Sequence, residues 1–252
     1  MFNFENQVVA ITGASSGLGK QMAEGFAKQG AIVVLMARRF EKLEALAQEI
    51  MDGGGQALAI QLDVTNDESI QASLDKIIEK YGKVDVLINN AGGSKGGGIS
   101  EMTNEAWDFT IELDLTSVFK MTRAYSAAMK EKKYGRIINI ASMYGMLGTN
   151  QEQCAYHASK AGVINFSRAV AGELAPFNIT VNTICPGYFE TELTAKTLHT
   201  DAFQSYCEAV VPLKRYGNSG ELNAAAIFLA SKEASYVTAT TLPVDGGWSA
   251  LK

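Results

Sequence analysis

Short hydrophobic runs alternate along the chain with longer amphipathic segments. The hydrophobic runs predict strands at residues 8–12, 32–36, 57–62, 84–88, 136–140, 180–184 and 241–244. Most of them are apolar at nearly every position, which is typical of parallel strands covered by helices on both faces. Between these runs, apolar positions at helical spacing predict helices near residues 17–29, 40–51, 67–80, 104–131, 155–175 and 219–230.

This alternation predicts an α/β protein with a doubly wound, Rossmann-type, seven-stranded parallel sheet and helices on both faces. No linker-like composition divides the chain, so residues 1–252 are expected to form a single domain. Its cofactor half is expected at about residues 1–140 and its catalytic and substrate half at about 141–252. The long segment 187–218 interrupts the rhythm beyond a strand end, where ligands bind in such sheets, and is interpreted as a substrate lid.

Composition narrows the class of protein. Hydrophobic residues make up 47% of the 252 positions and charged residues 19%, which suits a large core and excludes a disordered chain. The balance of 22 basic and 27 acidic residues gives a net charge of −5, so no nucleic-acid partner is expected. No apolar stretch reaches 18 residues and the N-terminus lacks a secretory pattern, so no membrane partner is expected either.

The few cysteines and histidines indicate neither a disulfide framework nor a metal site. Cys154, Cys185 and Cys207 lie far apart without CxxC spacing, and are expected to be reduced thiols in a cytoplasmic protein. His157 and His199 have no acidic cluster around them in the sequence, so no metal site is expected.

The segment TGASSGLG at residues 12–19 follows the first strand and opens the first helix. Glycines there let the backbone turn tightly and approach a pyrophosphate at the helix N-terminus. The spacing G-xxx-G-x-G differs from the commoner G-x-G-x-x-G, and a turn that only packs helix on sheet is the alternative. Its place between strand and helix favours a dinucleotide site made by Gly13, Ser15, Ser16, Gly17, Leu18 and Gly19.

The end of the second strand indicates which dinucleotide is bound. NAD sites commonly place a carboxylate here for the ribose 2′-hydroxyl, whereas an arginine suits the 2′-phosphate of NADP. This chain has Ala37, Arg38 and Arg39, which favours NADP(H). The alternative is that both arginines are solvated charges at the start of the next helix.

Two more strand ends are expected to follow the cofactor. Asp63, with Val64, is placed to accept a hydrogen bond from the adenine amino group, although a cap or turn is the competing role. Asn89 is expected to be partly structural, tying neighbouring strands together. It is followed by small and turn-forming residues beside which the cofactor backbone passes: Asn90, Ala91 and Gly92.

The sequence YHASK at residues 156–160 places Tyr156 and Lys160 on one helix face, four residues apart. A nearby cation favours the phenolate form of a tyrosine, which makes it an effective proton donor and acceptor for carbonyl and alcohol groups. Ser142, just after the fifth strand, is placed to hydrogen-bond the reacting oxygen. The Tyr–Lys spacing alone is weak evidence, but together with Ser142 and the glycine loop it is strong.

Taken together, the chain resembles a short-chain dehydrogenase/reductase of the NADP-preferring type over essentially its whole length. The resemblance is carried by TGASSGLG at 12–19, Asp63, NNAG at 89–92, Ser142, YHASK at 156–160, PG at 186–187 and VDGG at 244–247. It implies that Ser142 orients a carbonyl, that Tyr156 is the acid/base, and that Lys160 tunes Tyr156 and holds the nicotinamide ribose. It also implies nicotinamide contacts from Pro186, Gly187 and Thr191, and a homotetramer or homodimer.

One position departs from this family pattern. Asp114 occupies a helical site where the family normally has asparagine. An ionised carboxylate accepts hydrogen bonds but cannot donate them, and it is able to pair with Lys160 and reduce its effect on Tyr156. Activity with an altered pH profile is therefore expected, and Asp114 is counted with the catalytic group.

The leading hypothesis is an NADPH-dependent carbonyl reductase, or alcohol dehydrogenase in the reverse direction. A cofactor-binding regulatory or scaffold protein that has lost catalysis is the alternative, favoured only by Asp114. The substrate is left open among a keto-sugar acid, a 3-oxoacyl thioester and a keto-steroid. Segment 185–216 resembles the lid of gluconate 5-dehydrogenase-like members, and Lys95 and Lys196 are candidate partners for a sugar acid.

Overall fold

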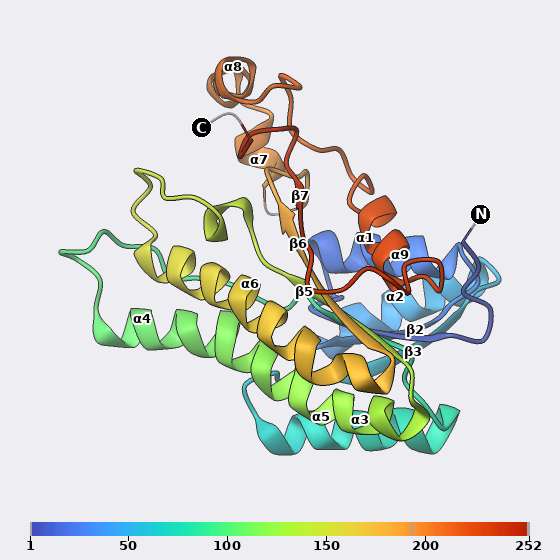
Figure 1. Ribbon diagram of the computed structural model, residues 1–252. Helices are drawn as coiled ribbons and strands as arrows, with labels where there is room; N and C mark the ends of the chain where they lie inside the picture. The colour runs from blue at the N-terminus through green and yellow to red at the C-terminus, as the bar shows by residue number, and fades with distance from the viewer. Residues whose placement is uncertain (1, 193, 251–252) are drawn as a thin grey trace.

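The computed structural model describes residues 2–192 and 194–250 (Figure 1). In these ranges the strands form one parallel sheet of seven, in the order β3-β2-β1-β4-β5-β6-β7, which confirms the predicted fold class. The predicted strands are all present, with ends shifted by up to two residues. Their bounds are β1 Val8–Thr12, β2 Ile32–Ala37, β3 Gln56–Gln61, β4 Val86–Asn89, β5 Gly135–Ile140, β6 Ile179–Pro186 and β7 Thr241–Val244.

Helices cover both faces of the sheet (Figure 1). One face packs on α1 (Gly17–Ala27), α2 (Phe40–Asp52) and α9 (Asn223–Ala230), and the other on α3 (Asp67–Tyr81), α5 (Ser117–Lys132) and α6 (Cys154–Leu174). In β1, Val9 and Ile11 face the first layer, whereas Val8 and Ala10 face the second. Both faces of the strand are buried, which is why its sequence is apolar at every position before the final Thr12.

The predicted helix over residues 104–131 is continuous but not uniform. It comprises α4 (Asn104–Ile111), a π-helical turn η1 (Glu112–Thr116) and then α5. The start is as expected, since the Thr103 side chain accepts a hydrogen bond from the Ala106 N–H. The π turn is a departure from the prediction, and it carries the buried Asp114. Such single-turn bulges recur at functional sites in helices.

The segment 187–218 contains two helices that the sequence pattern did not predict. They are the short α7 (Ala195–Leu198) and α8 (Asp201–Val210), which stand above the ends of β6 and β7 (Figure 1). Thr200 caps α8 by accepting a hydrogen bond from the Phe203 N–H. Helix α7 is a single turn and too short to show a period, whereas α8 is amphipathic, so a usable signal for α8 was present in the sequence.

Buried polar side chains tie the centre of the sheet together. Asn89 donates to Asn139 Oδ1 at 2.8 Å and to Thr122 Oγ1 at 3.2 Å, and Asn139 donates to Ser167 Oγ at 2.8 Å. These contacts confirm the structural part of the role expected for Asn89. No helix within the described residues is both long and apolar enough to span a membrane.

Candidate active site

The loop after β1 has the geometry of an anion cradle. Gly13 and Gly17 have φ angles of +68° and +58°, values that favour glycine. A Cβ at Gly13 would also lie 2.8 Å from Asn90 Nδ2. The loop is clamped to the loop after β4, since Thr12 Oγ1 accepts hydrogen bonds of 2.9 Å from the N–H groups of Asn90 and Ala91. Gly13 is therefore required both by the turn and by this close approach, whereas Gly17 is required by the turn alone.

The N-terminus of α1 opens beside this loop. Its cap residue, Ser16, makes no side-chain hydrogen bond to the first turn. The first N–H groups of a helix carry a partial positive charge and favour phosphate groups. This terminus therefore has the donors that a pyrophosphate requires.

A cleft of about 710 Å³ runs from this loop across the carboxyl ends of the strands. It brings together most of the predicted cofactor residues and also Tyr156. The lining set includes Gly13, Ser15, Ser16, Gly17, Leu18, Arg38, Arg39, Asp63, Val64, Asn90, Ala91, Gly92, Tyr156 and Thr191. Four of the predicted cofactor residues are not among the lining residues, namely Gly19, Lys160, Pro186 and Gly187, and neither are the predicted catalytic residues Ser142 and Asp114.

Close packing explains why two of these four residues, Gly19 and Gly187, are glycines. Gly19 is buried behind the loop, where a Cβ would collide with the Gly13 carbonyl oxygen and with Asn90 Nδ2. A Cβ at Gly187 would lie 2.7 Å from the Asp245 Cα. Both glycines therefore allow neighbouring backbone segments to approach each other.

The two arginines after β2 have different surroundings. Arg39 donates hydrogen bonds to Ser15 Oγ at 2.9 Å and to Ser16 Oγ at 2.7 Å. Arg38 makes no side-chain hydrogen bond or ion pair with the residues that the structure describes, so its guanidinium is available for a ligand. Hydrogen bonds from Thr65, and to a smaller extent the charge of Arg38, hold the pKa of Asp63 below its usual value.

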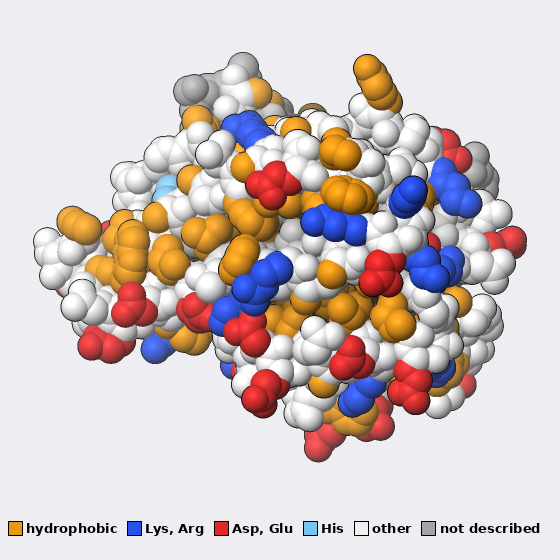
Figure 2. Space-filling model, turned by 60° about the horizontal axis from the view of Figure 1, so that its bottom comes forward, with side chains coloured by type: hydrophobic (Ala, Val, Ile, Leu, Met, Phe, Trp, Pro, Cys, Tyr) orange, Lys and Arg blue, Asp and Glu red, His pale blue; other side chains and the backbone are white. Residues whose placement is uncertain are grey.

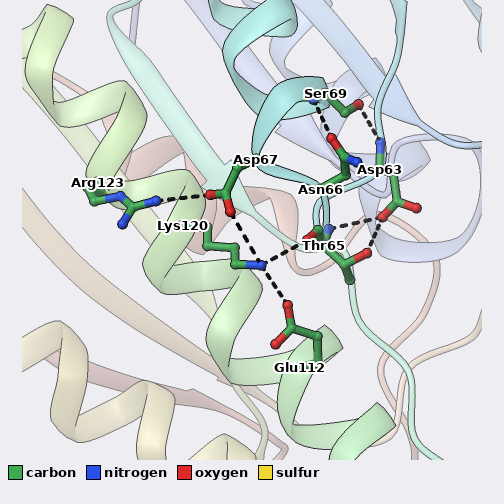
Figure 3. Close-up of polar contacts among 8 residues, drawn as sticks. All are labelled: Asp63, Thr65, Asn66, Asp67, Ser69, Glu112, Lys120 and Arg123. Atoms are coloured by element: carbon green, nitrogen blue, oxygen red, sulfur yellow. Dashed lines mark hydrogen bonds and ion pairs between the residues drawn. The ribbon is translucent and has the colours of Figure 1, made fainter.

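A network of charges anchors the loop that follows Asp63 (Figure 3). Lys120 on α5 donates to the Thr65 carbonyl oxygen and to Glu112 Oε1, each at 2.8 Å, and lies 3.8 Å from Asp67 Oδ2. The Glu112 hydrogen bond raises the pKa of Lys120, so the ammonium stays charged. Thr65 in turn donates to Asp63 Oδ1 from both its N–H and its hydroxyl, at 2.9 and 2.7 Å. Helix α5 therefore fixes one wall of the cleft.

Sequence reasoning missed part of this wall. Thr65 and three residues of the helix after β4 also line the cleft: Phe109, Glu112 and Leu113. A usable signal was present, because positions 109, 112 and 113 share one helical face. The π turn within this helix was not predicted. The sequence therefore did not determine whether these residues face the cleft.

The catalytic residues expected from the sequence meet where β5 and α6 approach each other. Lys160 is buried, donates to the Ile140 carbonyl oxygen at 3.2 Å, and places its ammonium 5.5 Å from the centre of the Tyr156 ring. Ser142, directly after β5, accepts a 3.2 Å hydrogen bond from the Tyr144 N–H. That contact uses an oxygen lone pair and leaves the Ser142 hydroxyl proton available to another acceptor.

Asp114 reaches the same place from the π turn. Its Oδ2 lies 3.5 Å from Lys160 Nζ, and its Oδ1 accepts a 2.7 Å hydrogen bond from the Gly93 N–H. Both side chains of the ion pair are buried. A Cβ at Gly92 would lie 2.8 Å from Asp114 Oδ1 and 3.3 Å from Lys160 Nζ, so glycine is needed for this fit. The ion pair anticipated from the sequence is present.

The fold and this cleft define a dinucleotide-binding α/β oxidoreductase. The chain matches, over residues 13–249, a family described as enoyl-(acyl carrier protein) reductase. It is 42% identical over 246 residues to the 3-oxoacyl-[acyl-carrier-protein] reductase FabG of Vibrio cholerae, covering 97% of this chain and 98% of that protein. It belongs to the short-chain dehydrogenase/reductase family.

Solved structures agree with this assignment. A putative gluconate dehydrogenase from Agrobacterium tumefaciens superposes with a TM-score of 0.96 at 31% identity, covering 100% of this chain and 99% of that one. A gluconate 5-dehydrogenase from Burkholderia cenocepacia, in complex with NADP and tartrate, gives 0.94 at 32% identity, with 100% and 98% covered. The protein is an oxidoreductase that interconverts C=O and CH–OH groups with a nicotinamide cofactor.

Proposed function

We propose that the protein is an NADPH-dependent carbonyl reductase in which Tyr156 is the acid/base. The single observation that carries this proposal is the buried Lys160 ammonium placed beside the Tyr156 ring, where Tyr156 lines the dinucleotide cleft. Ser142 lies two residues beyond Ile140, whose carbonyl oxygen accepts from Lys160. A scaffold without catalytic activity would not need a buried ammonium held against a tyrosine ring. The neighbouring cleft supplies phosphate donors at one end and Tyr156 at the other.

Each residue has a distinct task in this proposal. The nicotinamide, when bound, supplies a hydride to the carbonyl carbon. Ser142 donates a hydrogen bond to the carbonyl oxygen, and the Tyr156 hydroxyl gives that oxygen its proton. The Lys160 ammonium stabilises the phenolate that remains, because opposite charges attract strongly in a buried site. Donor and acceptor groups fixed before the reaction cost no reorganisation during it.

The preference for NADP(H) over NAD(H) follows from the arginines. Arg38 is uncommitted to other side chains, and Arg39 is held over the glycine loop by Ser15 and Ser16. Guanidinium groups bind phosphate through charge-assisted hydrogen bonds. We assign the ribose 2′-phosphate to Arg38, with Arg39 contributing from the other side.

The overall activity is tested by NADPH oxidation on a ketone panel. The panel contains a keto-gluconate, a 3-oxoacyl thioester, a keto-steroid and a small diketone. The proposal expects turnover on at least one class. NADPH binding without turnover on any of them would contradict it and favour a cofactor-binding scaffold.

Replacing Asp114 by asparagine is expected to shift the pH profile rather than abolish activity. The amide keeps the oxygen that accepts from Gly93 but removes the negative charge beside Lys160. The lysine then acts more strongly on Tyr156, so the rising limb of the alcohol-oxidation profile moves to lower pH by roughly one unit. Asp108→Asn, on the exposed surface of α4, is the matched control. Coincident profiles for the wild type and Asp114→Asn would remove this role for Asp114.

We also propose a homotetramer or homodimer in a reducing, cytoplasmic setting, with residues 187–218 closing over the substrate. Helices α4 and α5 carry exposed aromatic side chains, including Trp107 and Phe119. Both helices lie toward the face shown in Figure 2, where hydrophobic side chains gather between charged ones. Light scattering should give a mass of two or four chains.

The cysteines are free thiols in the described chain, which suits a reducing compartment.

A further inference from the structure

Beside Tyr156 lies a row of tyrosine hydroxyls that the proposed mechanism does not use. Tyr144 OH is 2.9 Å from Tyr188 OH, and Tyr188 OH is 3.4 Å from Tyr206 OH. We call these three residues the tyrosine chain. Its members come from separate segments, namely the 3-10 turn η2 (Met143–Gly145), the residues just after β6, and α8. The segments converge next to the catalytic group.

The tyrosine chain lies close to the reacting position. The rings of Tyr144 and Tyr156 meet edge to face, with centres 6.3 Å apart and an interplanar angle of 89°. Tyr144 also follows Ser142 by two residues, and its N–H donates to Ser142 Oγ. Both groups proposed to act on the substrate carbonyl are therefore in contact with Tyr144.

The rings of the chain are held in place before any substrate arrives. His157 stacks on Tyr144 with ring centres 4.9 Å apart and planes 7° from parallel. The His157 ring is itself fixed by the Gln153 carbonyl oxygen and Thr149 Oγ1, at 2.9 and 3.0 Å. Phe203 meets Tyr188 edge to face at 5.0 Å. Such preorganisation suits a binding site, since no ordering cost remains to be met on binding.

The chain has more hydrogen-bond donors than its own contacts use. Burial raises the pKa of Tyr144 and that of Tyr188, so both remain protonated. Three hydroxyls carry three protons, whereas the two contacts between them use only two. One O–H of the chain is therefore left to donate to an acceptor outside it.

We propose that this spare hydroxyl binds a second, uncharged oxygen of the substrate. The inference rests on the carbonyl reductase function proposed above and defines its substrate class: a ketone bearing a hydroxyl or second carbonyl near the reacting group. The aromatic rings of Tyr156, Tyr188 and Phe203 belong to one hydrophobic cluster. In this proposal the carbon skeleton of the substrate packs on that cluster. A substrate carboxylate fits less well, because a buried charge needs an uncommitted cation, and Arg215, which lines a pocket with Tyr188, is paired with Glu221. The Lys95 ammonium instead lies over the Phe109 ring at 4.7 Å, and Lys196 is exposed on α7.

The experiment compares cyclohexanone with cyclohexanones carrying one hydroxyl at C2, C3 or C4, each with NADPH. We expect at least one hydroxyketone to exceed cyclohexanone about tenfold in kcat/KM, which is the scale of one well-placed hydrogen bond. Replacing Tyr144, Tyr188 and Tyr206 together by phenylalanine removes every hydroxyl of the chain and keeps the rings. The triple variant should bring that ratio to about one and leave cyclohexanone within roughly twofold of wild type. The matched control is Tyr216→Phe, whose hydroxyl is outside the chain.

Different results overturn different claims. Equal kcat/KM for all four ketones in the wild type would overturn the second-oxygen site while leaving the reductase function in place. If the triple variant keeps the wild-type ratio, or loses kcat/KM equally on cyclohexanone and on the preferred hydroxyketone, the hydroxyls do not bind the second oxygen and the chain serves packing alone. The absence of NADPH oxidation with any ketone, including the wider panel above, would overturn the reductase function and this inference with it.

Discussion

Tyr156→Phe is expected to lower kcat/KM for NADPH-dependent ketone reduction at least a thousandfold, while NADPH affinity changes by less than about twofold. The substitution removes one oxygen and keeps the ring, so the edge-to-face contact with Tyr144 is retained. The glycine loop and the arginines at the other end of the cleft are untouched. Steady-state turnover and a fluorescence titration with NADPH measure the two quantities.

The matched control for this variant is Tyr125→Phe. Tyr125 is a buried tyrosine on α5 whose hydroxyl contacts Ser73 Oγ at 2.8 Å, within the core and outside the lining of the cleft. It undergoes the same deletion of one oxygen and is expected to keep wild-type turnover. Retention of more than about a tenth of the wild-type rate in Tyr156→Phe would exclude it as the acid/base.

The second large effect is expected from reversing the charge at Arg38. Arg38→Asp should lower the ratio of kcat/KM for NADPH to that for NADH by about a hundredfold. The variant removes charge-assisted hydrogen bonds to the 2′-phosphate and adds a carboxylate that repels it. The same carboxylate is suited to accept from the ribose 2′-hydroxyl of NADH.

A matched control separates the local effect from the change in net charge. Arg168→Asp makes the same charge reversal on α6, where the Arg168 side chain donates to Thr241 Oγ1. Its cofactor ratio is expected to stay at the wild-type value. If Arg38→Asp leaves the ratio unchanged while Arg39→Asp lowers it, the phosphate belongs to Arg39.

The strands and the dinucleotide cleft were predictable because their causes are local. A strand buried on both faces is apolar throughout, and the β1 loop needs glycine where φ is positive, at Gly13 and Gly17. The grouping of Ser142, Tyr156 and Lys160 was predictable from the motifs of the family, which fix both spacing and chemistry.

The features that escaped prediction depend on tertiary contacts. The π turn at Asp114 is one, since nothing in the local sequence marks where a helix widens to bring a carboxylate to Lys160 and Gly93. Another is the tyrosine chain, whose members are separated by up to 62 residues and meet only when the segment over β6 folds back. Lys120 is a third, because a lysine on a helix surface is ordinarily solvated.

The most direct test of the central claim follows the hydride itself. Wild-type protein is incubated with a substrate ketone and NADPH deuterated at both C4 positions, and the alcohol is analysed by mass spectrometry and NMR. The account predicts one deuterium on the carbinol carbon of the wild-type product, and no labelled alcohol above background from Tyr156→Phe. Alcohol formed without deuterium on that carbon, or labelled equally by both proteins, would contradict it.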